Sequence, residues 1–255
     1  MKISQAAAQL YTVRQHLKTP ADLAASLKKI KEIGYQAIQL ASVGPIPEDD
    51  LASMMADAGL ICCSAHEDAE AILDEPQRVA ERLTKFGCKL VSYPHPHVKL
   101  DTLDSVKALA AGLNAAGKVF HDAGITITYH NHSGEFRRFG GRLILEILYA
   151  ETDPKYLQGE VDTYWVQYGG GDSEDWCRSL KGRLPALHMK DYKTTPDGSP
   201  TWAEIGRGNL TWKPIIAAAE ASGCQWYIVE QDRCDGDPFD SVRISFEYIR
   251  DNLCS

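Results

Sequence analysis

The sequence predicts an α/β fold, a single-domain (β/α)8 TIM barrel spanning residues 1–255, and three observations support this prediction. Short β-rich runs alternate with longer amphipathic stretches along the whole chain. There are eight such runs, the number of strands in a closed α/β barrel. The first run continues into QLYTVRQHL, which has no glycine for a dinucleotide-binding loop and makes a doubly wound sheet the weaker alternative.

The predicted elements follow one another as strand, helix and glycine-bounded turn. The eight predicted strands cover residues 3–10, 37–41, 61–65, 90–93, 125–130, 157–162, 186–190 and 227–230. Three helical stretches with apolar residues at helical spacing end at Gly34, Gly124 and Gly223, which suit helix C-caps. Pro20 and Pro214 stand where a first helical turn tolerates proline. No linker or low-complexity run divides the chain.

Composition excludes several classes of function. The net charge is −8 and no basic run occurs, so neither nucleic acid nor an anionic membrane is an expected partner. No apolar run approaches the roughly 18 residues of a membrane span. The N-terminus lacks the apolar core of a secretion signal, and the seven cysteines are scattered without a CxxC pair. We therefore expect reduced thiols and a cytoplasmic protein.

Metal-capable side chains follow the predicted strands at their carboxyl ends, where a barrel carries its chemistry. The stretch TYHNHSGEF (128–136) places His130, His132 and Glu135 directly after the fifth strand. The other strand ends carry His66, His95, His97, Asp162, His188, Lys190, Asp191, Glu230 and Asp232. Imidazole and carboxylate ligands from neighbouring strands can converge above a barrel, and this donor set suits Mn, Zn, Co or Fe better than calcium. Taken singly, each side chain has a plainer explanation as a hydrogen-bonding or capping residue at the rim.

Six motifs follow one another over nearly the whole chain, namely QLYTVR, YHNHSGEF, EVDTYW, LHMKDY, EIGRGNLTWKPII and YIVEQD. With these motifs the chain resembles the xylose isomerase-like TIM barrel superfamily, in its sugar phosphate isomerase/epimerase branch with inosose dehydratase-like relatives. The resemblance implies one divalent metal ion, with Mn favoured over Co, Zn or Fe. It is usually held by Glu, Asp, His and Glu from the last four strands.

The resemblance assigns the last three ligands to Asp162, His188 and Glu230. In place of the first glutamate stands His130, with Glu135 as a second candidate, either as ligand or as a substrate-binding acid. Ketose 3-epimerases of the family move the proton with two metal-bound glutamates, and His130 removes half of that pair. The implied function is a metal-dependent isomerase or epimerase of a sugar or keto-sugar acting through an enediolate. A dehydratase (lyase) of a keto-sugar or cyclitol fits at least as well, and a non-catalytic sugar-binding barrel is a third alternative.

Four residues are candidates for the catalytic groups. Glu230 is the first choice for the base, and His132 or Glu135 is the second. Lys190 would stabilise an enolate oxygen or bind a hydroxyl, its alternative being a rim salt bridge. The rim partners in that alternative are Asp191 and Glu204.

Substrate contacts are expected from His66, Trp165 and Arg207. His66 is a possible acid, and Trp165 could stack on the apolar face of a sugar ring. Arg207 could bind a phosphate or carboxylate, but one arginine is thin support for a phosphorylated substrate, so we favour a neutral carbohydrate. Family members are often dimers or tetramers, which allows a homo-oligomer. An abasic-site endonuclease shares this fold, but the acidic chain lacks the basic face that binds DNA.

Overall fold

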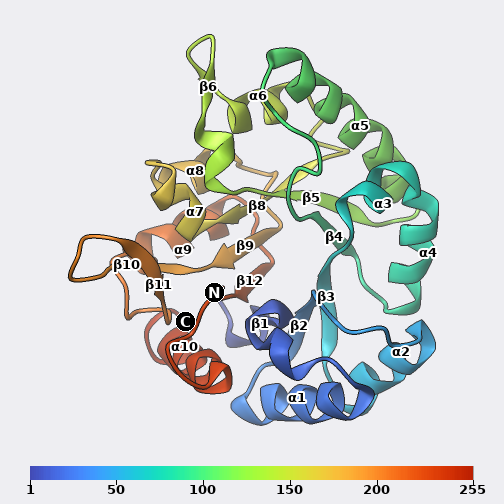
Figure 1. Cartoon of the computed structure of the whole chain (residues 1–255), viewed down its shortest axis with the longest axis vertical. Helices are drawn as coiled ribbons and strands as arrows, with labels where there is room; N and C mark the ends of the chain where they lie inside the picture. Colours follow the sequence, from blue (N-terminus) through green and yellow to red (C-terminus); the bar gives the residue numbers. More distant parts are fainter. Residues whose placement is uncertain (255) are drawn as a thin grey trace.

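The structure is a computed structural model that describes residues 1–254. Eight parallel strands close into a barrel, which confirms the predicted fold class (Figure 1). In order round the barrel they are β1 (Ala6–Gln9), β2 (Ala37–Leu40), β3 (Ile61–His66), β4 (Leu90–Tyr93), β5 (Thr126–His130), β8 (Gln158–Asp162), β9 (Ala186–Met189) and β12 (Trp226–Val229). Consecutive parallel strands are neighbours, as expected for right-handed βα units.

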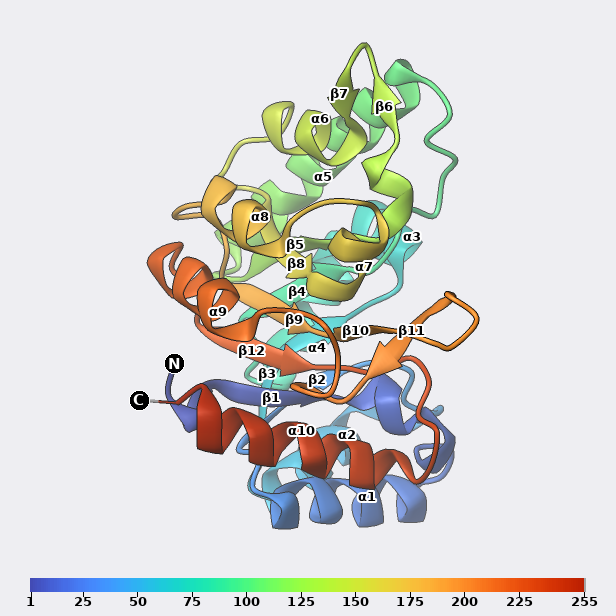
Figure 2. The same cartoon turned by 90° about the vertical axis from the view of Figure 1, so that its left-hand side faces the viewer.

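The helices surround the strands on the outside of the barrel (Figures 1 and 2). They are α1 (Pro20–Ile33), α2 (Glu48–Asp57), α3 (Ala69–Asp74), α4 (Pro76–Lys85), α5 (Leu103–Asp122), α6 (Ile144–Ala150), α7 (Thr163–Tyr168), α8 (Ser173–Ser179), α9 (Trp212–Ala221) and α10 (Pro238–Asn252). Gly34, Gly124 and Gly223 follow α1, α5 and α9 with φ of 127°, 72° and 94°, which confirms the predicted glycine turns.

The first predicted strand is longer than the observed one. A 3-10 turn, η1 (Ile3–Gln5), precedes β1, and a second, η2 (Leu10–His16), follows it. The side chain of Gln9 accepts a hydrogen bond from the backbone N–H of Tyr11 and so caps the chain where β1 ends. This local side-chain bond offers the backbone an alternative to the sheet ladder.

Two hairpins lie outside the barrel. One pairs β6 (Arg138–Phe139) with β7 (Arg142–Leu143), and the other pairs β10 (Asp191–Thr194) with β11 (Pro200–Ala203). The β10–β11 hairpin projects from the end toward which the barrel strands run (Figure 2). None of the helices in the described part of the chain has the length and apolar character needed to cross a membrane.

The interior of the barrel is unusually polar. Fully buried polar side chains come from β2, β3, β4, β5, β8 and β9, namely Gln39, Ser64, Ser92, Thr128, Glu160 and His188. A hydrogen bond of 3.0 Å from Gln39 Nε2 to Glu160 Oε2 spans the barrel between the opposite strands β2 and β8. Since barrel interiors are normally filled by branched apolar residues, this polar layer points to the chemistry at the strand ends above it.

Candidate metal centre and active site

Four side chains predicted as metal ligands meet at the carboxyl end of the barrel. His130 and Asp162 are the last residues of β5 and β8, His188 lies in β9, and Glu230 directly follows β12. One ligand atom from each lies within 4.8 Å of all the others, and all four residues are buried. They converge because β5, β8, β9 and β12 are consecutive neighbours in the barrel. We call these four residues the metal cluster.

The contacts of His130 give its two ring nitrogens different roles. Nδ1 lies 3.0 Å from the carbonyl oxygen of Pro94, and Nε2 lies 3.1 Å from Asp162 Oδ2. A carbonyl only accepts, so Nδ1 carries a proton. Nε2 faces a carboxylate oxygen, and a proton or a metal ion fits between these two atoms.

His188 is placed in the same way with the opposite nitrogen. Its Nε2 lies 2.6 Å from Gln39 Oε1 and 3.0 Å from Glu160 Oε1, so this nitrogen carries a proton. Its Nδ1 lies 3.0 Å from Glu230 Oε2, and both atoms are buried in ionic contacts without a well-directed hydrogen bond. Burial lowers the pKa of His188, but Glu160 and the other carboxylates more than offset this and raise it well above its ordinary value.

The four side chains of the cluster fit a cation. Once each ring has released the proton on its cluster-facing nitrogen, two imidazole nitrogens and two carboxylates face one small volume, and a single divalent ion can bind all of them at once. The remaining protonated nitrogens, His130 Nδ1 and His188 Nε2, donate outward to a carbonyl and to Gln39 and Glu160. This outward donation is the usual support of metal-bound histidines.

Lys190 lies beside the metal cluster and is fully buried. Its ammonium Nζ is 3.2 Å from Asp162 Oδ2, 3.0 Å from Glu230 Oε2 and 2.8 Å from Asp232 Oδ2. Burial lowers the pKa of Lys190, but the three carboxylates more than offset this, so its pKa is raised and the ammonium is permanent. The considered alternative of a rim salt bridge is therefore wrong.

Asp191, the considered partner of Lys190, has a different task. Its carboxylate accepts hydrogen bonds from the backbone N–H groups of Tyr192, Gly206, Gly208 and Leu210 and from Trp212 Nε1. It thereby holds the loop that leads into α9. Arg207 lies in this loop with an exposed side chain and does not line the cavity described next.

A cavity of about 370 Å³ opens over the metal cluster. The predicted site residues that line it are His66, His130, His132, Lys190 and Glu230. Ser42, also at its wall, is the one non-glycine residue with positive φ (52°) among residues 1–254. Backbone conformations of this kind gather at functional sites.

His132 and Trp165 lie next to one another at the cluster. The ring centroid of His132 is 4.9 Å from that of His130 and 5.3 Å from that of Trp165. Burial, reinforced by the charge at His130, lowers the pKa of His132 to about 3, so the ring is neutral. The Nδ1 of His132 is buried without a hydrogen-bond partner. Trp165 also lies beneath the Lys190 ammonium, 5.8 Å from its ring centroid.

Glu135 is not brought to the metal cluster. It is buried in η3 (Ser133–Phe136), where Oε1 accepts from the Tyr129 hydroxyl at 2.8 Å and Oε2 from the His132 backbone N–H at 3.2 Å. Its carboxylate therefore ties the TYHNHSGEF turn together. Of the two candidates for the first ligand, the structure places only His130 among the other three.

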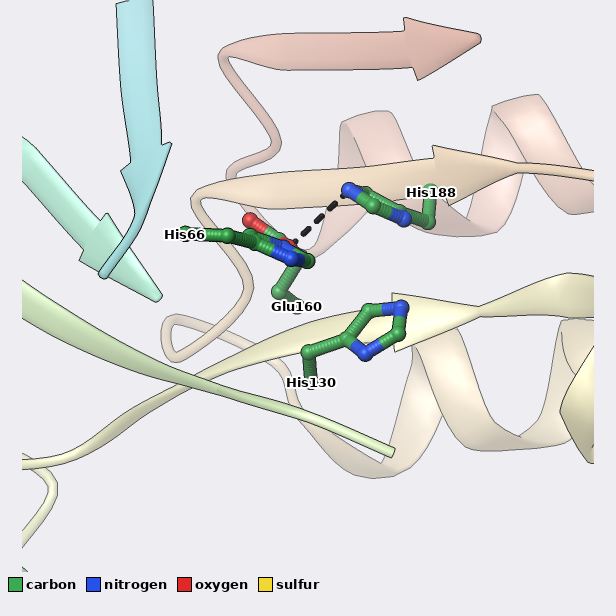
Figure 3. Close-up of side chains that lie close together, drawn as sticks. All are labelled: His66, His130, Glu160 and His188. Atoms are coloured by element: carbon green, nitrogen blue, oxygen red, sulfur yellow. Dashed lines mark hydrogen bonds and ion pairs between the residues drawn. The ribbon is translucent and has the colours of Figure 1, made fainter. Parts of the chain in front are cut away.

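Glu160 was missed in the sequence. Its fully buried carboxylate lies 2.7 Å from His66 Nε2 and 3.0 Å from His188 Nε2 (Figure 3). The signal was present, because Glu160 and Asp162 are two apart on one strand and so point to the same face. With His66, His130 and His188, Glu160 forms a second group whose ligand atoms lie within 4.8 Å.

Hydrogen bonding separates this second group from the metal cluster. Both oxygens of Glu160 already accept N–H donors, from His66, His188 and Gln39. His66 can donate from Nε2 because its Nδ1 faces the amide nitrogen of Gln9 at 3.5 Å. Burial lowers the pKa of His66 to about 4, so this ring is neutral as well. The second group is thus a satisfied network, whereas His188 Nδ1 and Glu230 Oε2 of the metal cluster lack a directed hydrogen bond.

Comparison with known proteins agrees with this architecture. The family model described as xylose isomerase-like TIM barrel matches residues 27–252. An inosose dehydratase from Geobacillus thermodenitrificans is 28% identical over 162 residues, 56% of this chain and 53% of that protein. The chain therefore spans about half the length of this curated relative. Two Parabacteroides distasonis proteins named sugar phosphate isomerase/epimerase match in structure with TM-scores of 0.85 and 0.82, at 23% and 25% identity. These alignments cover 99% and 97% of this chain and 96% and 98% of theirs.

Proposed function

The chain belongs to the xylose isomerase-like TIM barrel family, and we propose that it is a divalent-metal-dependent dehydratase of a keto-sugar or keto-cyclitol. In this reaction a base takes the proton next to the carbonyl, the C–H electron pair forms a double bond, and a β-hydroxyl leaves with a proton as water. The observation that carries the proposal is the replacement of one of the two family glutamates by His130, with Glu135 turned away to Tyr129. Elimination needs one base and one acid, whereas the epimerases use two opposed glutamates.

The metal cluster, His130, Asp162, His188 and Glu230, would hold one divalent ion, for which we favour Mn²⁺. When bound, such an ion polarises the carbonyl and lowers the cost of negative charge that develops as the proton leaves. The inosose dehydratase relative supports a substrate of the keto-cyclitol kind.

We assign the base to His132 from its position. Its ring lines the cavity and has a buried nitrogen free of hydrogen bonds. Glu230, the first choice from the sequence, lies 3.0 Å from the Lys190 ammonium and belongs to the metal cluster. Burial raises the pKa of Glu230, but Lys190 and His188 more than offset this and hold it well below its ordinary value. Its carboxylate would therefore be occupied as a ligand.

Lys190 would stabilise the developing enolate oxygen, because its ammonium is fixed at the cluster by three carboxylates. Trp165 contacts His132 and lies under the Lys190 ammonium but does not line the cavity, so it would support these two side chains instead of stacking on the substrate as expected from the sequence. Among the described residues that line the cavity, Lys190 is the only lysine or arginine. Since its charge is already neutralised, a neutral substrate fits better than a phosphorylated one.

The test is incubation of the Mn²⁺-loaded protein with an inosose and a panel of keto-sugars in deuterated water. We expect a product that has lost water, followed by mass spectrometry and by the absorbance of the new conjugated carbonyl. His132→Gln should lower kcat by about 10²–10⁴-fold, the usual contribution of a general base. The matched control is His121→Gln in α5, which is exposed and far from the cavity and should leave kcat unchanged.

A sugar isomerase or epimerase is the second candidate. The Parabacteroides distasonis protein at 25% identity, named sugar phosphate isomerase/epimerase, favours it. Its signature in the same experiment is a product of unchanged composition that carries deuterium at the carbon next to the carbonyl. Tight binding with neither exchange nor water loss would instead identify a non-catalytic sugar-binding barrel.

A further inference from the structure

The polar layer inside the barrel suggests a role for a residue that the reaction itself does not use. We propose that Glu160 is a positioning residue, which fixes the orientation and the protonated nitrogen of His188 and so sets the affinity of the metal cluster. The inference rests on the proposed function, since it concerns the same metal ion. Glu160 lies two residues before Asp162 on β8 and does not line the cavity.

Glu160 is surrounded by hydrogen-bond donors. Oε1 accepts from His66 Nε2 at 2.7 Å and lies 3.0 Å from His188 Nε2, and Oε2 accepts from Gln39 Nε2 at 3.0 Å. Within residues 1–254, no lysine or arginine forms an ion pair with it. Burial of a carboxylate costs free energy, and the hydrogen bonds that offset this cost also fix its position.

The first consequence concerns the two nitrogens of His188. A metal-bound imidazole carries its proton on one nitrogen only, and the hydrogen bond made by that nitrogen decides which one it is. Because Glu160 only accepts, it keeps the proton on Nε2. The lone pair then remains on Nδ1, which faces Glu230 at 3.0 Å and Asp162 at 3.8 Å.

The second consequence runs through Gln39. An amide can present either its oxygen or its NH₂ to His188, and these two orientations favour opposite ring protonation. Glu160 accepts from the NH₂ of Gln39, which leaves the amide oxygen 2.6 Å from His188 Nε2. Ser64 Oγ, also bonded to the NH₂ at 3.0 Å, can both donate and accept and does not decide the orientation. The Glu160 carboxylate therefore fixes both which way the Gln39 amide faces and which nitrogen of His188 carries the proton.

The experiment compares Glu160→Gln with two references. Asp162→Asn alters a residue of the metal cluster itself. Ser92→Ala alters the same polar layer but not the support of His188, because Ser92 is hydrogen-bonded to Thr128. Affinities for Mn²⁺ and Co²⁺ are measured by calorimetry or chelator competition without substrate. The visible absorption spectrum of the Co²⁺ protein reports on the ligands directly.

We expect Glu160→Gln to bind one ion per chain with about 10–100-fold weaker affinity and a shifted Co²⁺ spectrum, the usual effect of losing a support of a metal-bound histidine. Ser92→Ala should behave as the wild type, and Asp162→Asn should lose far more. If Glu160→Gln does not fold, Glu160→Met is the second variant. It removes the carboxylate that supports His188 Nε2 and should weaken binding in the same direction.

Two outcomes would overturn the positioning role. Wild-type affinity and spectrum in Glu160→Gln, or in Glu160→Met as its replacement, would show that His188 needs no such support. A loss as complete as in Asp162→Asn would make Glu160 a ligand and move the ion into the second group with His66. A wild-type protein that binds no metal would instead contradict the proposed function, which separates the two failures.

Discussion

Concentrated buried charge is the main feature of this protein at the scale of single residues. Asp162 and Glu230 are buried, and Asp232 is largely so, around a single ammonium, that of Lys190. Glu160 is buried beside them with histidine partners only. Taking these groups out of water is expensive, so each must be paired or hydrogen-bonded. The concentration of charge at this end of the barrel therefore lowers the stability of the fold.

Removal of the ammonium should therefore cost much more than the removal of a surface charge. Lys190→Met leaves Asp162, Glu230 and Asp232 without their cation and should lower the free energy of unfolding by about 3–5 kcal/mol. The measurement is denaturant unfolding at neutral pH without metal. Added Mn²⁺ should restore part of the loss, because it supplies positive charge to the same carboxylates.

The control for this variant is Lys193→Met, three residues along the chain. Lys193 forms only a surface pair with Asp235, at 3.4 Å, and its loss should cost less than about 1 kcal/mol. Equal effects of the two variants would contradict the account of Lys190 as the counter-charge of the cluster.

At the scale of single elements, the two-residue period of a strand governs the site. Glu160 and Asp162 share one face of β8, and His188 and Lys190 share one face at the end of β9. The helices contribute packing instead, and α5 contains a close approach that a sequence cannot show. A Cβ on Gly117 would lie 2.0 Å from the carbonyl oxygen of Tyr156.

Two glycine-to-alanine variants in α5 should therefore have opposite effects. Gly117→Ala should lower the free energy of unfolding by about 1–3 kcal/mol, since the backbone of Tyr156 has to move. The Cβ of Gly112→Ala would lie 3.6 Å from the Leu73 side chain, an ordinary van der Waals contact. This variant should raise the free energy of unfolding by up to about 1 kcal/mol, because alanine is a better helix former than glycine. Thermal or denaturant unfolding of the two variants tests this prediction. Stabilisation by both substitutions would contradict the close approach of Gly117 to Tyr156.

At the scale of the whole molecule, formation of the barrel couples metal binding to folding. The four residues of the metal cluster come from four different strands, which lie side by side only in the folded protein. An ion that binds this arrangement and not the unfolded chain must stabilise the folded state.

Metal removal should accordingly lower the thermal stability. A hundredfold excess of free Mn²⁺ over its Kd adds about 2.7 kcal/mol, which raises Tm by roughly 5–10 °C for a chain of this size. Calorimetry with and without a chelator measures the shift. Glu230→Gln should abolish it, whereas Glu151→Gln, an exposed change, should keep it. A wild-type Tm that does not change when Mn²⁺ is added would argue against metal binding at the metal cluster.

The sequence by itself determined the number, order and approximate bounds of the eight barrel strands, although not the hairpins β6–β7 and β10–β11, and it pointed to His130, Asp162, His188 and Glu230. It could do so because period-two patterns and strand ends are local, and because barrel topology places successive strand ends together. The family resemblance supplied the ligand pattern, and the family is now shown by the match over residues 27–252.

Only the tertiary structure decided the partners of these residues. It turned Glu135 toward Tyr129, left Arg207 outside the cavity, and surrounded Lys190 with three carboxylates. It also joined Gln39 to Glu160 across the barrel, 121 positions apart in the chain. A pattern along one strand tells which face a side chain occupies, but which atoms meet inside a closed barrel depends on the distance between strands that are not neighbours.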